Sequence, residues 1–245
     1  MLRALHTLEV ISDKQTIGIT ELSRVVGLQK STTARIINTL KTAGYVEQEA
    51  RTGKISLTFK TFEVGSRAVI DLDLLKKARP LMEDFAEKTG ESIMLAQWHK
   101  TDIIYIDCIK STQPIQLRAG IGDKAPLYCT ASGKSVLAAL EPNSLESILE
   151  KIDLKAMTKN TITSYTELKN ELNLTRARGY AIDNEERHEG VKALATVIKD
   201  YHQKVVGAIT VPVFTFRIST SYLDSLASQV MEFGSKINLA MGYTE

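Results

Sequence analysis

Apolar residues recur at helical spacing in three short segments near the N-terminus, residues 2–11, 20–26 and 30–42. Positions three and four residues apart lie on one face of a helix, so each segment predicts a short amphipathic helix. The apolar faces are Leu2, Leu5, Leu8 and Ile11; Leu22, Val25 and Val26 behind a Thr20 cap; and Thr33, Ile36, Ile37 and Leu40. Gly27 and Gly44 follow the second and third segments, where glycine commonly ends a helix. Two short helices joined by a tight turn predict a helix-turn-helix.

Residues 45–48 and 54–59 alternate in the manner of strands around the turn residues 50–53, which predicts a β-hairpin, or wing, beside the helices. Residues 61–75 return to helical spacing and predict a linker helix. Pro80 then predicts a break or the first turn of a new helix, because proline lacks the N–H that a helix interior needs. We therefore expect a winged helix-turn-helix in residues 1–60 and a linker in residues 61–75.

Beyond Glu91 the pattern changes to β-rich segments between helical ones. The expected strands are 92–98, 103–109, 115–119, 180–183, 192–198 and 205–211, and the expected helices are 130–140, 166–178 and 219–241. Residues 120–126 predict a loop. Strands interleaved with flanking helices predict an α+β domain in residues 76–245, which we expect to fold without the N-terminal part.

Charge divides along the same boundary. Residues 1–62 carry nine Lys and Arg against five Asp and Glu, whereas the whole chain has a net charge of only +2. A basic module on a slightly acidic body favours a nucleic-acid partner for that module alone. Cys108 and Cys129 form no metal-ligand spacing, so no metal and no cofactor are expected, and so few cysteines favour a reducing compartment. The sequence shows no signal-peptide core and no apolar run of membrane-spanning length, which predicts a cytoplasmic protein without a membrane partner.

The polar face of residues 30–42 is basic, rich in hydroxyl groups and free of acids. Cations on such a helix neutralise phosphates, and short polar side chains reach base edges in the major groove. The expected DNA-binding residues are Lys30, Ser31, Thr32, Arg35 and Asn38 of the helix, with Arg51 and Lys54 of the wing. An ordinary amphipathic surface helix is the alternative for this segment alone. The adjoining helices and basic hairpin favour double-stranded DNA.

Two segments of the C-terminal half carry candidate chemistry. Gly133-Lys134-Ser135 is similar to the end of a P-loop, but Tyr128 occupies the position of the first glycine, so we reject nucleotide binding. An anion-binding helix N-terminus and a simple helix cap remain as alternatives. Asp183 lies in a loop with two glutamates and His188, for which a general base, a metal ligand and a solvated acidic loop are the alternatives. Trp98 and Tyr105 are interpreted as core residues, with ligand stacking as the alternative.

Three longer motifs carry a resemblance: KSTTARIINTLKTAGYV at 30–46, GDKAPLYCTASGKSVLA at 122–138 and RGYAIDNEERHEGV at 178–191. In this order, and over nearly the whole chain, they resemble the IclR family of bacterial transcriptional regulators. The segments IGITELSRVVGLQKST, LKTAGYVEQE and SLTFKTFEVGSRA are similar to the branch that regulates ketodeoxygluconate catabolism. The resemblance implies a winged helix-turn-helix, a linker helix and a GAF/PAS-like effector-binding domain. It also implies a homodimer or a dimer of dimers on a palindromic operator.

The resemblance further implies a site for a small organic or aromatic acid. The residues at the matching positions are Ala131 and Ser132, through backbone N–H groups, and Asp183, Ala193, Thr210 and Pro212. Of the last three, only Thr210 keeps a side-chain donor, so the pocket is expected to differ from that of its relatives. The hypothesis is a ligand-responsive regulator, a repressor of a catabolic operon, that senses a small organic or sugar acid. The alternative is an enzyme or small-molecule sensor with an accessory DNA-binding-like domain.

Overall fold

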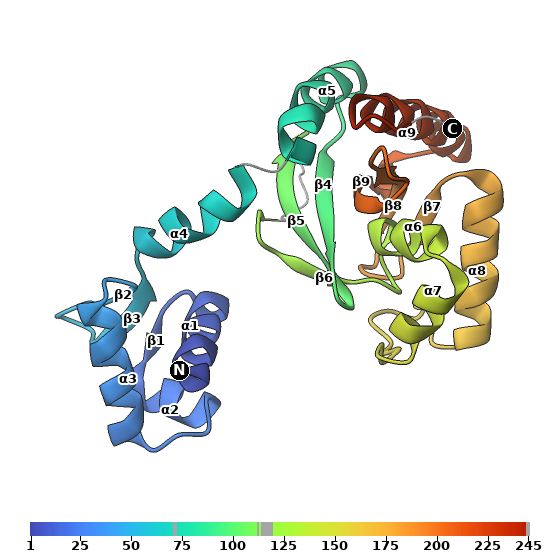
Figure 1. Ribbon diagram of the computed structural model, residues 1–245. Helices are drawn as coiled ribbons and strands as arrows, with labels where there is room; N and C mark the ends of the chain where they lie inside the picture. Colours follow the sequence, from blue (N-terminus) through green and yellow to red (C-terminus); the bar gives the residue numbers. More distant parts are fainter. Residues whose placement is uncertain (71–72, 112, 114–119, 244–245) are drawn as a thin grey trace. The chain divides into compact units, whose positions relative to one another are not determined.

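The chain forms two units, Met1–Ile70 and Asp71–Glu245. The computed structural model (Figure 1) describes residues 1–245 except 71–72, 112, 114–119 and 244–245, and it leaves out the side chains of residues 66–70. Each unit has its own core and is described by itself. The finer division at residues 60 and 75 remains a prediction. Among the described helices, none combines the length and the apolar character needed to cross a bilayer.

Three helices and a small sheet form most of the N-terminal unit, and a fourth helix follows them. Its elements are α1 (Leu2–Lys14), β1 (Ile17–Gly18), α2 (Ile19–Val25), α3 (Lys30–Thr42), β2 (Val46–Gln48), β3 (Lys54–Leu57) and α4 (Phe59–Ile70). The strands are antiparallel in the order β1-β3-β2. Gly27 and Gly44 have φ angles of 66° and 80° just beyond α2 and α3, which other residues adopt at a cost. This is the winged helix-turn-helix that the sequence predicts.

The core of this unit confirms most of the expected apolar face of α3. Thr33, Ile37 and Leu40 are buried, and Ile36 is partly buried against them. The Thr33 hydroxyl donates to the Gln29 carbonyl at 3.2 Å, so a polar residue is satisfied inside the core. The remaining buried apolar residues are Val10, Ile11, Ile17, Leu22, Val46 and Ile55.

One expectation for the first helices is confirmed only in part, since Leu8 and Ile11 pack in the core, and one is wrong. Leu2 and Leu5 of α1 are exposed, whereas Thr7, Val10 and Ile11 are buried. The sequence of α1 carries apolar residues on more than one face, and packing against β3 and α2 selects the face that contains Ile11. Similarly, α2 begins at Ile19 with Gly18 as its N-cap, so Thr20 lies inside the helix and does not cap it.

The beginning of α4 is bonded to the end of α3. The Thr58 hydroxyl donates to the Gly44 carbonyl at 2.5 Å, and the Lys60 ammonium donates to the Ala43 carbonyl at 2.7 Å. Lys60 thereby caps the free carbonyls at the negative end of α3. Phe59, expected as the last residue of the second hairpin strand, instead begins α4 and is exposed. A reorientation of α4 would therefore act directly on α3.

The C-terminal unit is built on a six-stranded antiparallel sheet in the order β6-β5-β4-β9-β8-β7. The strands are β4 (Ile93–His99), β5 (Asp102–Ile109), β6 (Lys124–Pro126), β7 (Ala181–Asn184), β8 (Val191–Lys199) and β9 (Val205–Phe214). The helices are α5 (Asp73–Thr89), α6 (Ala131–Ala139), α7 (Pro142–Leu149), α8 (Tyr165–Arg178), the 3-10 turn η1 (Thr215–Arg217) and α9 (Thr220–Ala240).

Helices cover both faces of this sheet, as Figure 1 shows. The neighbours Ala195 and Thr196 on β8 point to opposite sides, Ala195 toward Ala131 of α6 and Thr196 toward Gly234 of α9. Helices α5 and α9 lie together on one face, with Phe85 and Phe233 4.8 Å apart between ring centroids. Helix α6 covers the other face, with α8 packed against it. The result is the α+β, GAF-like architecture expected from the sequence.

The structure corrects two further expectations and adds a helix. Pro80 lies inside α5 and does not break it, because Leu74, Ala78 and Met82 on both sides of it are buried and hold the helix in place. The expected loop 120–126 ends in the short edge strand β6, and α7 was not anticipated. The expected strand 115–119 lies outside the described residues.

Candidate functional site: a DNA-binding face and a ligand cavity

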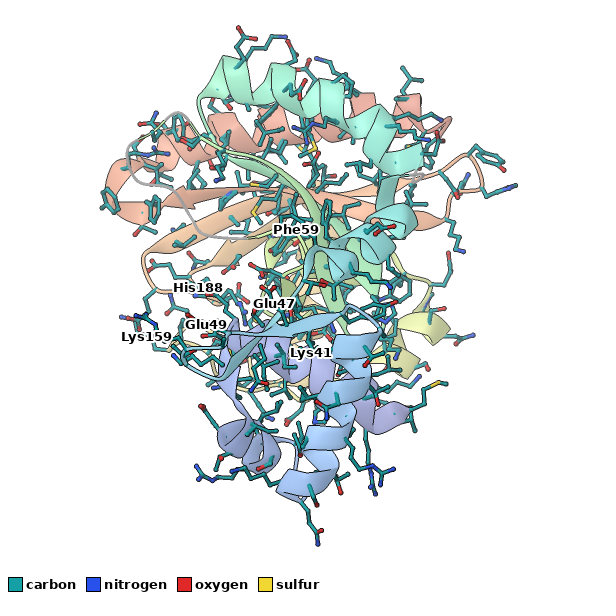
Figure 2. All side chains as sticks on the ribbon, turned by 90° about the vertical axis from the view of Figure 1, so that its left-hand side faces the viewer. Lys41, Glu47, Glu49, Phe59, Lys159 and His188 are labelled. Carbon is teal, nitrogen blue, oxygen red and sulfur yellow. The ribbon has the colours of Figure 1, made fainter. Side chains whose placement is uncertain are left out.

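The basic face of α3 is free to bind a partner. Lys30, Ser31, Arg35 and Asn38 are exposed and Thr32 is partly exposed. Within the described part of the chain, no hydrogen bond or ion pair engages the side chains of Lys30, Arg35 or Asn38. Lys41 extends this face toward the C-terminal end of α3 (Figure 2). Unpaired Lys and Arg side chains on an exposed helix can neutralise the phosphates of a DNA backbone.

The wing, residues 46–57, is a closed hairpin with a mixed charge pattern. Its turn is held by Gly53 N–H donating to the Glu49 carbonyl at 2.8 Å and by Gln48 Nε2 donating to the Gly53 carbonyl at 2.8 Å. Arg51 and Lys54 are both exposed. Glu47 lies in β2 and Glu49 directly follows that strand (Figure 2). The positive charge of the wing is therefore confined to the turn and the start of β3.

In the C-terminal unit, a cavity of about 350 Å³ opens at the N-terminus of α6. Residues from β4, β5, β6, α6, β7, β8 and β9 line it: Met94, Tyr105, Asp123, Lys124, Ala125, Thr130, Ala131, Asp183, Arg187, His188, Val191, Ala193, Thr210 and Pro212. Its volume suits a small molecule. Five of the six effector residues expected from the sequence, Ala131, Asp183, Ala193, Thr210 and Pro212, therefore meet in one cavity.

Ser132, the sixth expected residue, lies directly behind the cavity wall. It is 1% exposed, and its hydroxyl faces the Tyr105 phenol without a partner at hydrogen-bonding geometry. Thr130 caps α6 by accepting from Gly133 N–H at 3.1 Å. The N–H groups of Ala131 and Ser132 remain without an intrahelical partner, as at the start of any helix. Such a helix start attracts anions.

Sequence reasoning missed the cavity residues Arg187, Lys124 and Met94, and for Tyr105 it favoured a core role over a ligand contact. Tyr105 packs against the core as expected, but it also lines the cavity. Arg187 lies within a motif that carries the family resemblance. A lone arginine in an otherwise acidic loop is the local signal that could have identified it as a candidate anion-binding residue. The positions of Met94 and Lys124 depend on strand pairing and carry no local signal.

Asp183 is the most perturbed acid of the cavity. Burial raises its pKa from 3.8 to about 7, and the negative charge of Glu186 adds to that shift. Its Oδ1 accepts from the backbone N–H groups of Glu186 at 2.8 Å and Arg187 at 3.3 Å. Near neutral pH, Asp183 can therefore accept a hydrogen bond from a ligand hydroxyl or, when protonated, donate one to a ligand carboxylate.

A buried ion pair lies beside Asp183 and joins the cavity loop to α6. Lys134 is fully buried, and its Nζ donates to Glu186 Oε1 at 2.5 Å. Glu171 of α8 lies 3.6 Å from the same nitrogen and is itself paired with Arg178 at 2.6 Å. Lys134, the lysine of the apparent P-loop motif, thus holds the Asp183 loop in place.

We expect the stability of the protein to depend on the ionisation of Asp183. Between about pH 4 and pH 7, its carboxyl is protonated in the folded protein but ionised in the unfolded chain, so folding takes up a proton. The free energy of unfolding must then fall as pH rises through this window. Thermal denaturation from pH 4 to pH 8 should show this fall in the wild type and a weaker one in Asp183→Asn. Glu189→Gln, which changes an exposed acid of the same loop, is the control. Parallel curves for wild type and Asp183→Asn would contradict the assignment.

The acidic loop does not form a metal centre in the part of the chain that the structure describes, where no group of three or more His, Cys, Asp or Glu side chains is arranged to hold an ion. Burial and the neighbouring charge of Arg187 lower the pKa of His188. It is therefore neutral at pH 7 and adds no positive charge to the cavity.

A winged helix-turn-helix with a free basic face, joined in one chain to an α+β domain that encloses a cavity, defines a ligand-responsive DNA-binding regulator. Residues 2–50 match the model for the IclR helix-turn-helix domain, and residues 66–239 match that for the bacterial transcriptional regulator IclR C-terminal domain. The chain therefore belongs to the IclR family of bacterial transcriptional regulators. DNA is its partner, and the alternative of an enzyme is set aside because the family and the curated relatives are regulators.

Individual relatives match along the whole chain. The HTH-type transcriptional regulator KdgR of Escherichia coli (strain K12) is 36% identical over 243 residues, covering 99% of this chain and 92% of KdgR. The acetate operon repressor of Salmonella typhimurium (strain LT2) is 32% identical, covering 99% and 89%. The crystal structure of Thermotoga maritima IclR is 26% identical, with a TM-score of 0.78 and coverage of 98% and 97%.

Proposed function

We propose that the protein represses a catabolic operon by binding a palindromic operator as a homodimer or dimer of dimers, and that a small carboxylate in the C-terminal cavity modulates this binding. The observation that carries the proposal is the convergence of the α6 N-terminus, Asp183 and Thr210 on one small cavity. The name of one relative, the acetate operon repressor, supports the repression of a catabolic operon.

The free cations of α3 and the wing support a specific DNA contact. We expect Arg35→Ala to weaken operator binding by about 1–3 kcal/mol if Arg35 reads a base. Lys54→Ala should weaken operator and unrelated DNA about equally, because a phosphate contact carries no sequence information. Gel-shift titration at two salt concentrations measures both effects. Lys159→Ala, which removes an exposed cation of the C-terminal unit (Figure 2), is the control. Unchanged operator affinity in both test variants would refute this interface.

Exposed apolar side chains on the N-terminal unit support association with a second copy. Leu2 is 84% exposed on α1, and Phe59 and Phe62 are 89% and 69% exposed at successive turns of α4. Such side chains are costly on a monomer and are typical of protein interfaces. Sedimentation of the free protein and of its operator complex tests the proposal, which requires an even number of protomers in the complex. A monomer on DNA would overturn it.

The features of the cavity support a carboxylate effector. The free N–H groups of Ala131 and Ser132 favour an anion. Asp183 is available to a ligand hydroxyl or, protonated, to the carboxylate. The Thr210 hydroxyl donates to the Leu194 carbonyl at 3.2 Å and can accept from a ligand hydroxyl. Ala193 and Pro212 supply apolar contact and no side-chain donor. A thermal-shift screen of organic, aromatic and sugar acids tests this. A ligand at 100 times its Kd stabilises the protein by roughly 2.7 kcal/mol. Stabilisation only by uncharged compounds would contradict the proposal.

A further inference from the structure

Arg187 is distinguished from the other arginines of the C-terminal unit by its lack of a partner. Arg79, Arg178 and Arg217 form ion pairs with Asp107, Glu171 and Glu91 respectively, and Arg176 donates to the Ala138 carbonyl at 2.6 Å. Among the arginine side chains of this unit that the structure describes, only the Arg187 guanidinium has no hydrogen bond or ion pair. It is partly buried and lines the cavity.

The backbone that carries Arg187 is held firmly. Its N–H and that of Glu186 donate to Asp183 Oδ1. The Thr158 and Thr161 hydroxyls donate to the carbonyls of Glu185 and Glu186 at 2.6 and 2.7 Å. The guanidinium is therefore presented from a fixed loop. A planar guanidinium binds a carboxylate through two parallel hydrogen bonds, and desolvation within a cavity strengthens that contact.

The polar and apolar groups of the cavity are segregated. Arg187, Asp183 and Lys124 come from the β7–β8 loop, the end of β7 and the edge strand β6. The central strands β4, β8 and β9 contribute Met94, Val191, Ala193 and Pro212, with Thr210 as their one hydroxyl. The Thr210 hydroxyl already donates to the Leu194 carbonyl at 3.2 Å. Ligand hydroxyl groups that lie against this strand wall therefore find no free side-chain donor, and unpaired buried polar groups are costly.

We infer that the effector is a carboxylate with an apolar body, whose carboxylate is bound by Arg187 and whose body packs on the wall of Met94, Val191, Ala193 and Pro212. This inference rests on the proposed ligand-binding function of the cavity and narrows its ligand class. It also makes Arg187 a determinant of specificity for carboxylates over uncharged ligands. The strand wall carries no charge, so the guanidinium supplies the positive charge that faces the ligand carboxylate. Uncharged molecules of the same shape leave the guanidinium desolvated and unpaired.

The test measures ligand-induced thermal shifts and Kd values on the full chain with phenylacetate, hexanoate, the uncharged phenylacetamide and the hydroxylated gluconate. Phenylacetate or hexanoate should stabilise the wild type, and phenylacetamide and gluconate should not. Arg187→Gln should weaken binding of the apolar acid at least tenfold. Arg187→Lys should weaken it less, because a point charge remains without the bidentate geometry. Lys159→Gln removes an exposed cation outside the cavity and should bind as the wild type does.

The possible failures separate this inference from the proposed function. Equal binding of the apolar acid by wild type, Arg187→Gln and Arg187→Lys would overturn the role of Arg187. Equal binding of phenylacetamide and phenylacetate would do the same. Stabilisation by gluconate alone would overturn the apolar body while leaving a carboxylate-sensing cavity intact. No shift with any carboxylate would overturn both proposals. An unchanged melting temperature of each ligand-free variant establishes that it folds.

Discussion

Replacement of Lys134 by Met should destabilise the C-terminal unit by about 3–5 kcal/mol, the usual cost of removing one partner from a buried ion pair. Lys134 is fully buried, and Glu186, its partner at 2.5 Å, is 4% exposed. Without the ammonium, Glu186 must ionise in an apolar interior or take up a proton, and its Oε2 already has no hydrogen-bond partner. Urea denaturation followed by circular dichroism measures the loss.

A double variant separates the ion pair from the packing of its side chains. Lys134→Met with Glu186→Leu removes both charges and keeps similar volumes, so it should recover much of the stability lost in the single variant. Lys159→Met, at an exposed position, should change stability by less than about 0.5 kcal/mol. If Lys134→Met were as harmless as Lys159→Met, the pair would not hold the cavity loop.

Replacement of Gly133 by Ala should damage the same region for a steric reason. A Cβ on Gly133 would lie 2.3 Å from the Leu127 carbonyl oxygen and 2.4 Å from the Leu127 Cα. Both neighbours are backbone atoms, so no side chain can move to relieve the overlap. Overpacking of a core costs about 1–3 kcal/mol even where side chains can adjust. We expect a loss at the upper end of that range or beyond, with α6 displaced and the ligand-induced thermal shift abolished.

The matched control is Gly65→Ala in α4. Apart from its own helix, no heavy atom that the structure describes lies within 4 Å of a Cβ built at Gly65. Alanine in a helix interior is more favourable than glycine by roughly 0.5–1 kcal/mol. The two identical substitutions should therefore have opposite signs in thermal denaturation. A Gly133→Ala protein with wild-type stability and ligand binding would show that the approach of α6 to Leu127 is looser than described.

The sequence determined those features that depend on the spacing of residues within a single helix or strand. The buried face of α3 follows from the local positions of Thr33, Ile37 and Leu40, and the ends of α2 and α3 follow from Gly27 and Gly44. These features depend on interactions within a few residues, so a linear pattern contains them. The free basic face of α3 was equally visible, because the residues opposite a buried stripe are exposed.

Where local preference left a choice, the tertiary structure decided. Helix α1 has more than one apolar face, and only its packing buries Ile11 and exposes Leu2. Pro80 weakens one turn of α5, but burial of Leu74 and Met82 outweighs that loss. In both cases the deciding contacts come from other elements, and their free energy exceeds the intrinsic preference of the segment.

The residues of the cavity fall into the same two groups, those that the sequence identified and those that only the fold brought together. The family motifs were sufficient to single out Ala131, Asp183 and Thr210, because each lies in or beside a recognisable stretch. Lys134 pairs with Glu186, which lies 52 residues further along the chain. Arg187 lines the same cavity as Met94 and Tyr105. Both arrangements arise only when the six strands assemble. The sequence by itself thus determined most of the elements and the class of protein. The charge and shape presented to a ligand were decided by the tertiary structure, since they depend on which distant side chains share one desolvated space.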